Sequence, residues 1–291
     1  MPRLALRLSP SIRIEAGLLV SLFFAWLSLI KNSPTLVIKS IVKRKKDLLT
    51  MISNSKIILK TQSLAKFVSL EDKQLNLLQD VNLAVTAGQT LAIVGSSGSG
   101  KTTLLSILAG LDLPSSGEVY LKNKALHQLN EEQRSQVRAE HVGFIFQQFL
   151  LVNSLTALEN VMLPAELANN LDAKQLAMSL LAQVGLSERV NHFPSQLSGG
   201  EQQRVAIARA FITKPDILFA DEPTGNLDKH TSTHIADLLF DLNKQFGTTL
   251  VLVTHDLTLA KRCQQRVEMS DGKLVETHII TETAAPAEKT A

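Results

Sequence analysis

The segment 95–102, which reads Gly-Ser-Ser-Gly-Ser-Gly-Lys-Thr, constrains the fold of this chain more than any other part. It lies between the apolar run 91–94 and a stretch, 104–108, whose leucines and isoleucine have helical spacing. Strand, glycine-rich turn and helix in this order form a phosphate-binding loop, because glycines let backbone N–H groups turn inward around a polyphosphate. The helix N-terminus adds its dipole, Lys101 is expected to reach the β- and γ-phosphates, and the Thr102 hydroxyl to bind Mg²⁺. The sequence therefore predicts a nucleoside triphosphate site formed by Gly95, Ser96, Ser97, Gly98, Ser99, Gly100, Lys101, Thr102 and Thr103.

Short apolar runs separated by stretches of helical spacing predict an α/β fold. The predicted strands are 57–68, 75–85, 91–94, 142–146, 217–220 and 248–254. Uninterrupted apolar strands of this kind are typical of a parallel sheet that helices cover on both faces. Between residues 150 and 193 the strand pattern stops, and 158–167 and 174–184 have helical spacing. We therefore expect one domain over 55–280, with a parallel-sheet core, an antiparallel β edge and an α-helical subdomain inserted at about 148–200.

Four of the predicted strands end in polar residues: Gly95, Gln147, the pair Asp221 and Glu222, and His255. Because open α/β sheets bind ligands at the carboxyl ends of their strands, we expect these residues to face one crevice. Asp221 is expected to hold Mg²⁺, and Glu222 to orient and deprotonate an attacking water. His255 can hydrogen-bond the γ-phosphate and the water, and Gln147 can ligate Mg²⁺ or its water. Simpler roles stay open for both, namely a structural histidine and an amide that caps a strand end.

A second candidate anion site is the stretch 197–204, which reads Leu-Ser-Gly-Gly-Glu-Gln-Gln-Arg and heads a predicted helix over 202–211. A serine hydroxyl, glycine amides and a helix dipole together suit a phosphate. Because residues 95–102 already form one phosphate loop, a second site in the same chain indicates a partner molecule. The residues expected to act on that partner are Ser198, Gly199, Gly200 and Glu201.

The stretch 197–204 resembles the signature motif of ABC transporter ATPases, and the resemblance covers nearly all of 57–280 in family order and spacing. It implies a P-loop NTPase fold of the ABC ATPase type, with ATP and Mg²⁺ as ligands. In the family pattern Thr102, Gln147 and Asp221 correspond to the metal-binding positions.

The same resemblance implies a head-to-tail homodimer with two ATP molecules at its interface, in which each signature meets the γ-phosphate held by the other copy. Glu222 then matches the catalytic base, His255 the switch histidine, and Asp228 belongs to the loop that communicates across the dimer. Phe67 falls where the family has an aromatic residue stacked on adenine. A buried strand phenylalanine explains that position equally well.

The motif at 221–228, Asp-Glu-Pro-Thr-Gly-Asn-Leu-Asp, resembles the corresponding motif of the bacterial lipoprotein-release and macrolide-export ATPases, and most of all that of the YbbA type. This resemblance implies an ATP hydrolase that drives a separate integral membrane permease from the cytoplasmic face of the bacterial inner membrane. An ABC ATPase with a regulatory or scaffolding role at the envelope stays open as an alternative. The first interpretation predicts turnover stimulated by permease and cargo, and the second predicts partner binding with little transport.

Charge and cysteine content narrow the possible partners and the compartment. Residues 51–291 hold 21 Lys/Arg and 25 Asp/Glu, so nothing in their bulk charge indicates nucleic-acid binding. The single cysteine, Cys263, excludes an intrachain disulfide and fits a reducing compartment. We expect it to be a packed, inert thiol within a helix.

The first fifty residues differ from the rest of the chain, with nine Lys/Arg against two Asp/Glu. Residues 16–30 form a weakly polar to apolar run that would span about 22 Å as a helix, less than the ~30 Å hydrocarbon core. A basic cluster follows at 43–46. The expected explanations are sequence translated upstream of a start at Met51 or a membrane anchor. The tail 281–291, rich in Ala, Thr, Glu, Lys and Pro, is expected to be disordered.

Overall fold

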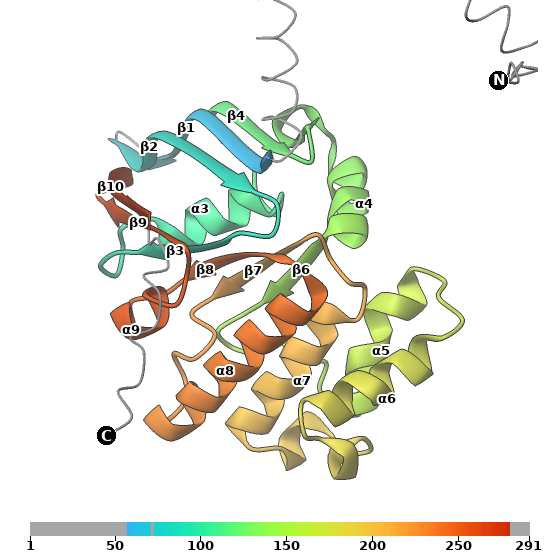
Figure 1. The fold of residues 1–291 in the computed structure, drawn as a ribbon. Helices are drawn as coiled ribbons and strands as arrows, with labels where there is room; N and C mark the ends of the chain where they lie inside the picture. The colour runs from blue at the N-terminus through green and yellow to red at the C-terminus, as the bar shows by residue number, and fades with distance from the viewer. Residues whose placement is uncertain (1–56, 71–72, 280–291) are drawn as a thin grey trace, which may run out of the picture. The chain divides into compact units, whose positions relative to one another are not determined.

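The computed structural model describes residues 57–70 and 73–279 (Figure 1). The chain divides into two compact units, Met1–Lys56 and Ile57–Ala291, and the description covers only the second. The predictions for residues 1–50 and for the tail 281–291 therefore lie outside the described residues. Within the described ranges, no helix combines the length and the apolar character that crossing a bilayer requires.

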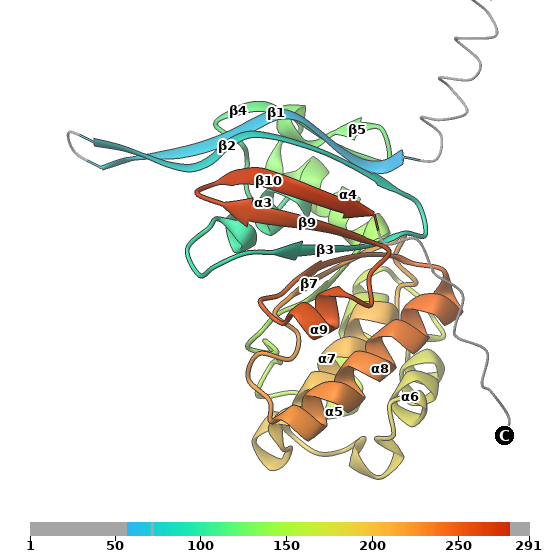
Figure 2. The same ribbon diagram turned by 60° about the vertical axis from the view of Figure 1, so that its left-hand side comes forward.

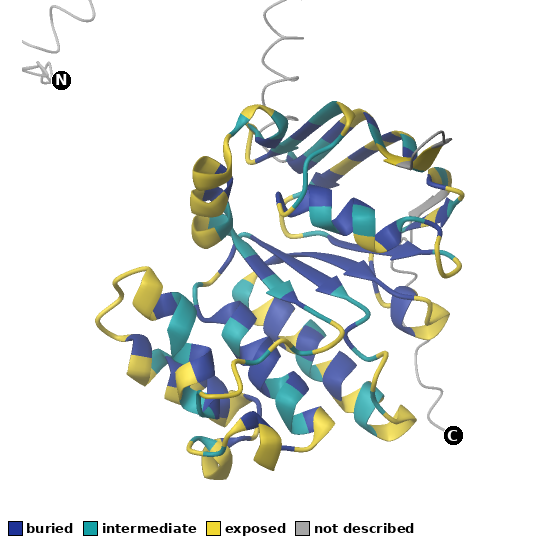
Figure 3. Ribbon diagram, turned by 180° about the vertical axis from the view of Figure 1, so that it is seen from behind, coloured by how far each residue is buried: buried dark blue, intermediate teal, exposed yellow. Residues whose placement is uncertain are grey.

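The larger sheet has six strands: β3 (Thr90–Val94), β6 (Val142–Ile145), β7 (Ile217–Asp221), β8 (Thr249–Val253), β9 (Gln265–Ser270) and β10 (Lys273–Ile279). Their spatial order is β10-β9-β3-β8-β7-β6. All neighbours are parallel except β10, which is antiparallel to β9. Every residue of β3 and β8 is buried, which explains why their sequences are continuously apolar (Figure 3). The predicted parallel-sheet core is confirmed.

The smaller sheet is antiparallel, in the order β2-β1-β4-β5, and consists of β1 (Ile57–Leu70), β2 (Lys73–Thr86), β4 (Ser116–Leu121) and β5 (Lys124–Ala125). Its β1–β2 hairpin extends beyond the other strands (Figure 2). The helix α3 (Lys101–Leu108) packs between the two sheets, with Leu104, Leu105, Ile107 and Leu108 fully buried in one core with strand residues of both sheets. The predicted antiparallel edge is confirmed, and the structure adds β4, β5, β9 and β10, which the sequence patterns did not predict.

On the opposite face of the larger sheet lie α7 (Gly199–Phe211) and α8 (Lys229–Phe246), and α5 (Ala157–Leu167) and α6 (Ala173–Gln183) pack against α7 (Figure 1). They share a second core with alternate residues of the same strands, such as Ala92 of β3 and Leu252 of β8. The remaining helical segments are α4 (Glu131–His141), α9 (Leu257–Ala260), η1 (Leu126–Gln128), η2 (Ser187–Arg189) and η3 (Pro194–Gln196).

The structure differs from the sequence predictions at α7 and at Cys263. The helix predicted over 202–211 begins earlier, at Gly199, because Ser198 and Glu201 cap its first turn reciprocally. Cys263 does not lie in a helix, since α9 ends at Ala260 and the chain turns before β9. Its thiol is nonetheless packed, 1% exposed, and burial raises the pKa of Cys263 to about 12.

Candidate nucleotide site

The loop between β3 and α3 has two positions that only glycine fits. The backbone φ is 154° at Gly95 and 97° at Gly100, both outside the range that side chains adopt readily. An added Cβ would lie 2.3 Å from the Met269 carbonyl oxygen at Gly95, and 2.7 Å from the Leu77 carbonyl oxygen at Gly100. Gly100 is also the N-cap of α3, where among the described residues no side chain caps the helix. The first amides of α3 are therefore available to an anion.

Lys101 and Ser99 give this loop its polar character. The Lys101 side chain folds over the loop, and its Nζ donates to the carbonyl oxygens of Gly95 at 2.9 Å and Ser96 at 2.8 Å. The Ser99 hydroxyl is buried and has no hydrogen-bond partner within the described part of the chain. A nearly buried cation and an unpaired hydroxyl in a glycine loop fit a polyphosphate ligand.

Thr102 and Asp221 form the candidate Mg²⁺ position. The Thr102 Oγ1 donates to Asp221 Oδ1 across 3.4 Å, at the end of β7. Desolvation raises the pKa of Asp221, a shift that the Thr102 hydrogen bond opposes and the neighbouring Glu222 charge reinforces. A desolvated carboxylate beside a hydroxyl fits a hard cation, which prefers oxygen ligands. Within residues 57–70 and 73–279, no group of three or more His, Cys, Asp or Glu side chains is placed to hold a metal ion.

Glu222 and His255 form a hydrogen-bonded pair beside the loop. His255 Nδ1 lies 3.0 Å from Glu222 Oε1, and because an ionised carboxylate only accepts, Nδ1 carries the proton. Glu222 has φ of 45°, and its N–H donates to the Val253 carbonyl oxygen at 2.9 Å. Its side chain is 15% exposed, whereas that of His255 is 71% exposed. The carboxylate is therefore oriented by a partner and remains largely shielded from bulk water.

These groups surround one cavity of about 750 Å³. The structure thus brings together residues from all four strand ends selected from the sequence, and Asp221 of β7 reaches the same site through Thr102. The cavity is lined by Leu77, Gly95, Ser96, Ser97, Gly98, Gly100, Lys101, Thr102, Thr103, Gln147, Glu222, Val253 and His255. Leu77, from β2, is a lining residue that nothing in the sequence pattern indicated.

The signature stretch lies apart from this cavity, and none of its residues is among those that line it. Ser198 is the N-cap of α7: its Oγ accepts from Glu201 N at 3.3 Å and donates to Glu201 Oε2 at 2.9 Å. Glu201 Oε2 also accepts from Ser198 N at 2.8 Å, and Arg189 Nε lies 3.0 Å from Oε1. These contacts, led by the Ser198 amide, lower the pKa of Glu201 to about 2. The first helix amides, of Gly199 and Gly200, are left for an external anion.

The comparison with known proteins decides which family this arrangement belongs to. The family model described as ABC transporter matches residues 78–225. The chain is 55% identical over 221 residues to the uncharacterized ABC transporter ATP-binding protein YbbA of Escherichia coli K12. The aligned stretch covers 75% of this chain and 97% of YbbA. This chain belongs to the ABC transporter ATP-binding family. It is an ABC-type ATPase that binds ATP.

Other members of the family align over a similar length. The lipoprotein-releasing system ATP-binding protein LolD of Legionella pneumophila is 47% identical over 220 residues, 75% of this chain and 97% of LolD. Among solved structures, the ATP-binding cassette MJ0796, a dimer in a post-hydrolysis state bound to ADP and Pi, is 38% identical with a TM-score of 0.71. It covers 77% of this chain and 99% of MJ0796. Another is cbiO1 of Clostridium perfringens, part of the complex cbiONQ, at 26% identity and a TM-score of 0.68 over 77% and 89% of the two chains.

In this ABC ATPase the Gln147 amide is directed at the turn after Glu222. Its Nε2 lies 3.4 Å from Asn226 Oδ1, and the Gln147 carbonyl oxygen accepts from Asn226 Nδ2 at 2.9 Å. Gln147 therefore lines the cavity, but within the part of the chain that the structure describes it forms no hydrogen bond with Thr102 or Asp221. Asp228, two residues after Asn226, is the N-cap of α8 and accepts hydrogen bonds from the amides of the first turn of that helix.

Phe67 of the ABC ATPase lies in β1, 39% exposed, so the interpretation as a buried strand residue is wrong. Its backbone N–H donates to Ser115 Oγ at 3.1 Å. It is not among the residues lining the nucleotide cavity, so stacking on adenine stays a prediction.

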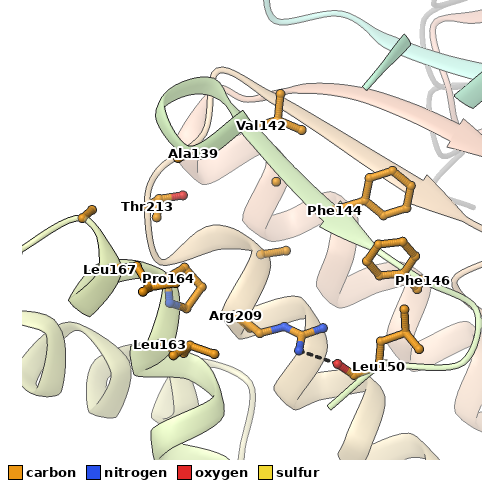
Figure 4. A pocket seen from close by; sticks show the side chains of 13 residues that line it. Ala139, Val142, Phe144, Phe146, Leu150, Leu163, Pro164, Leu167, Arg209 and Thr213 are labelled. Carbon is orange, nitrogen blue, oxygen red and sulfur yellow. Dashed lines mark hydrogen bonds between the residues drawn. The ribbon is translucent and has the colours of Figure 1, made fainter. Parts of the chain in front are cut away.

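A second cavity, of about 390 Å³, opens between β6, α5 and α7 (Figure 4). It is mostly apolar, and the rings of Phe144 and Phe146 stack in it with centroids 4.1 Å apart. Arg209 donates to the carbonyl oxygens of Phe149 at 2.8 Å and Leu150 at 2.7 Å, and burial lowers its pKa. Since Gln147 directly follows Phe146, this apolar cavity and the nucleotide cavity are joined by adjacent residues.

Proposed function

We propose that this chain is the ATP-hydrolysing subunit that energises a separate integral membrane permease, working as an ATP-sandwich homodimer at the cytoplasmic face of the bacterial inner membrane. The observation that carries the proposal is the convergence of Lys101, Glu222 and His255 on one cavity, while the signature residues lie outside it. One chain thus offers a nucleotide pocket and a separate anion-binding helix end that its own pocket does not use. A second copy supplies the missing half of each site.

The catalytic roles follow from the chemistry of the side chains. Glu222 accepts a proton from the attacking water, and His255 holds the carboxylate by donating from Nδ1. When the ring is doubly protonated, His255 also donates from its other nitrogen to the γ-phosphate. Lys101 leaves its carbonyl partners to bind the β- and γ-phosphates. Thr102, Asp221 and Gln147 are the residues that would hold Mg²⁺, which when bound neutralises phosphate charge.

In the dimer, the signature of each copy faces the γ-phosphate bound to the other copy. The signature residues are Ser198, Gly199, Gly200 and Glu201. The dimeric state of MJ0796 with ADP and Pi supports this arrangement. Asp228 caps α8 directly after the turn that carries Glu222, so a contact at Asp228 across the interface would be transmitted to the catalytic turn. Phe67, exposed on β1, is proposed to stack on adenine.

The permease is proposed to dock in the apolar cavity of Figure 4. An apolar cavity that opens to the surface suits a protein partner, and its wall continues through Phe146 into Gln147. The likeness to LolD makes a permease of the lipoprotein-release type the first candidate. Cross-linking in membranes should place partner contacts within 147–170 and purified permease should stimulate ATP turnover; contacts confined to residues after 281 would reject this docking site.

The catalytic proposal is tested by Glu222→Gln. Glutamine keeps the size and a hydrogen bond but does not accept the proton, so hydrolysis should fall about 10²–10⁴-fold while ATP binding persists. The trapped ATP should hold the variant as a dimer in size-exclusion chromatography with Mg²⁺-ATP. Adding Ser198→Arg should return it to a monomer that still binds ATP, because the long side chain blocks the opposite phosphate. A Glu222→Gln monomer with ATP bound would reject the sandwich, and wild-type turnover would remove Glu222 from catalysis.

A further inference from the structure

The signature site contains a negative charge where a phosphate is expected. Glu201 accepts two hydrogen bonds from Ser198 through the same oxygen, Oε2, and its side chain is only 20% exposed. The low pKa of this carboxyl keeps it ionised at neutral pH. A phosphate oxygen bound by the Ser198 hydroxyl at ordinary hydrogen-bond length would lie within about 6 Å of Glu201 Oε2. Two anions this close repel each other unless a cation is present.

Arg189 supplies that cation from outside the signature stretch. It lies at the end of η2, nine residues before Ser198, and its Nε lies 3.0 Å from Glu201 Oε1. It therefore binds the carboxylate oxygen that Ser198 does not use. We propose that Arg189 is a positioning residue of the signature, which neutralises and holds Glu201 so that Ser198 and Gly200 can receive the γ-phosphate of a second copy. This inference rests on the proposed ATP-sandwich dimer.

The single proton of the serine hydroxyl explains why Arg189 is needed. Ser198 Oγ now directs this proton to Glu201, so donating it to a phosphate breaks that bond. Glu201 then keeps the Ser198 amide and Arg189 as partners, and Arg189 alone of the two carries a compensating charge. Without Arg189, Glu201 would keep only the Ser198 amide as a hydrogen-bond donor, and no positive charge would offset its repulsion from the phosphate.

The test measures dimer dissociation constants in Mg²⁺-ATP by analytical ultracentrifugation, with Glu222→Gln as the parent. Adding Arg189→Ala should weaken the dimer about tenfold, which corresponds to about 1.4 kcal/mol, in the range of a charge-assisted hydrogen bond. Arg189→Lys should recover most of the affinity because it keeps the charge. Raising the salt concentration should reduce the difference, since Arg189 is 46% exposed.

The decisive comparison repeats Arg189→Ala on a parent that also carries Glu201→Gln. The glutamine oxygen still accepts from the Ser198 amide, so the cap survives without the charge. We expect Arg189→Ala to have no effect there, since no charge is left to neutralise. Lys124→Ala is the control, because it breaks an exposed ion pair between Lys124 of β5 and Glu140 of α4. This substitution should leave the dimer dissociation constant unchanged in either parent.

The outcomes separate this inference from the proposal beneath it. A parent Glu222→Gln that stays monomeric with ATP bound overturns the sandwich and the inference together. A dimeric parent that Arg189→Ala weakens equally with Glu201 or Gln at position 201 overturns the inference alone, because Arg189 would then act on the nucleotide or on the fold. A dimeric parent that is indifferent to Arg189→Ala also overturns it.

Discussion

Asn160→Ala is the substitution whose cost the structure defines best. Asn160 is fully buried in the first turn of α5 and holds the preceding loop through four hydrogen bonds. Its Oδ1 accepts from Val152 N at 2.8 Å, and its Nδ2 lies 3.0–3.1 Å from the carbonyl oxygens of Val152, Leu155 and Thr156. The loop it holds joins α5 to Leu150 in the apolar cavity.

The expected loss follows from which groups alanine leaves unpaired. The Val152 carbonyl keeps the Leu155 amide, and the Thr156 carbonyl keeps the helical amide of residue 160. The Val152 N–H and the Leu155 carbonyl lose the bonds that Asn160 supplies. At about 1–3 kcal/mol for each of these two unsatisfied groups, the free energy of unfolding should fall by about 2–6 kcal/mol. At about 2–4 °C per kcal/mol for a domain of this size, that lowers Tm by about 4–24 °C.

Urea unfolding of the full chain measures this loss as a lower midpoint at unchanged m-value. Asn191→Ala, at an exposed asparagine, is the matched control and should stay within about 0.5 kcal/mol of wild type. Hydrogen exchange adds a local readout, because the Val152 amide should lose protection before the strands do. An Asn160→Ala variant as stable as Asn191→Ala would show that this loop is not held by the buried amide, and the bond-by-bond reasoning would fail.

Three further predictions concern single sites. Gly100→Ala should weaken nucleotide binding by tenfold or more in a fluorescent-nucleotide titration with the circular dichroism spectrum retained, since φ of 97° and the Leu77 carbonyl both exclude a Cβ; tight binding would refute it. Cys263, the single cysteine, should react with a thiol reagent at pH 8 only as the protein unfolds, because burial holds its pKa at about 12. The Glu201 pKa lies below its ordinary value of 4.5, at about 2, so its stabilisation is present above pH 4.5 and is lost as pH falls towards 2. The difference in unfolding free energy between wild type and Glu201→Gln should therefore shrink over that range, and a constant difference would contradict the assignment.

The parts of the fold that the sequence predicted are those with one unambiguous pattern. β3 and β8 are buried on both faces, so their sequences are uninterrupted apolar runs. β9 escaped prediction because only Val267 and Met269 are buried in it, and a six-residue strand with two buried positions has too little alternation to recognise. β4 is similar, with Val119 and Leu121 as its buried residues.

The start of α7 was misplaced although its signal was present. Ser198 followed three residues later by Glu201 is the spacing of a capping box, which marks a helix N-terminus. The two glycines between them oppose that signal, because glycine has low helix propensity. The reciprocal cap prevails locally, and the glycines leave the first-turn amides without side chains around them.

Arg189 and Asn226 show what a linear pattern does not contain. Arg189 reaches Glu201 from η2, and Asn226 bonds Gln147 from a turn that is 79 residues away in sequence. No rule of local structure fixes the sequence separation of either pair, because each contact depends on how separate segments pack. Such contacts become visible only when the chain is folded.

The pair Asp221 and Glu222 is the case in which strand geometry alone would have misled. Successive side chains of a strand point to opposite faces, so an extended chain would direct these two carboxylates apart. β7 ends at Asp221, and Glu222 takes a left-handed φ of 45°, which the Val253 carbonyl and the Gly225 amide hold in place by hydrogen bonds. Asp221 thereby keeps its strand direction and reaches Thr102, while Glu222 turns to His255 in the cavity. A non-glycine residue in this conformation costs on the order of 1–3 kcal/mol, and the cost is localised at the residue proposed as the base. The left-handed turn directs one carboxylate to Thr102, the proposed metal position, and the other to His255, the proposed position of the water, whereas a relaxed strand end would direct them apart.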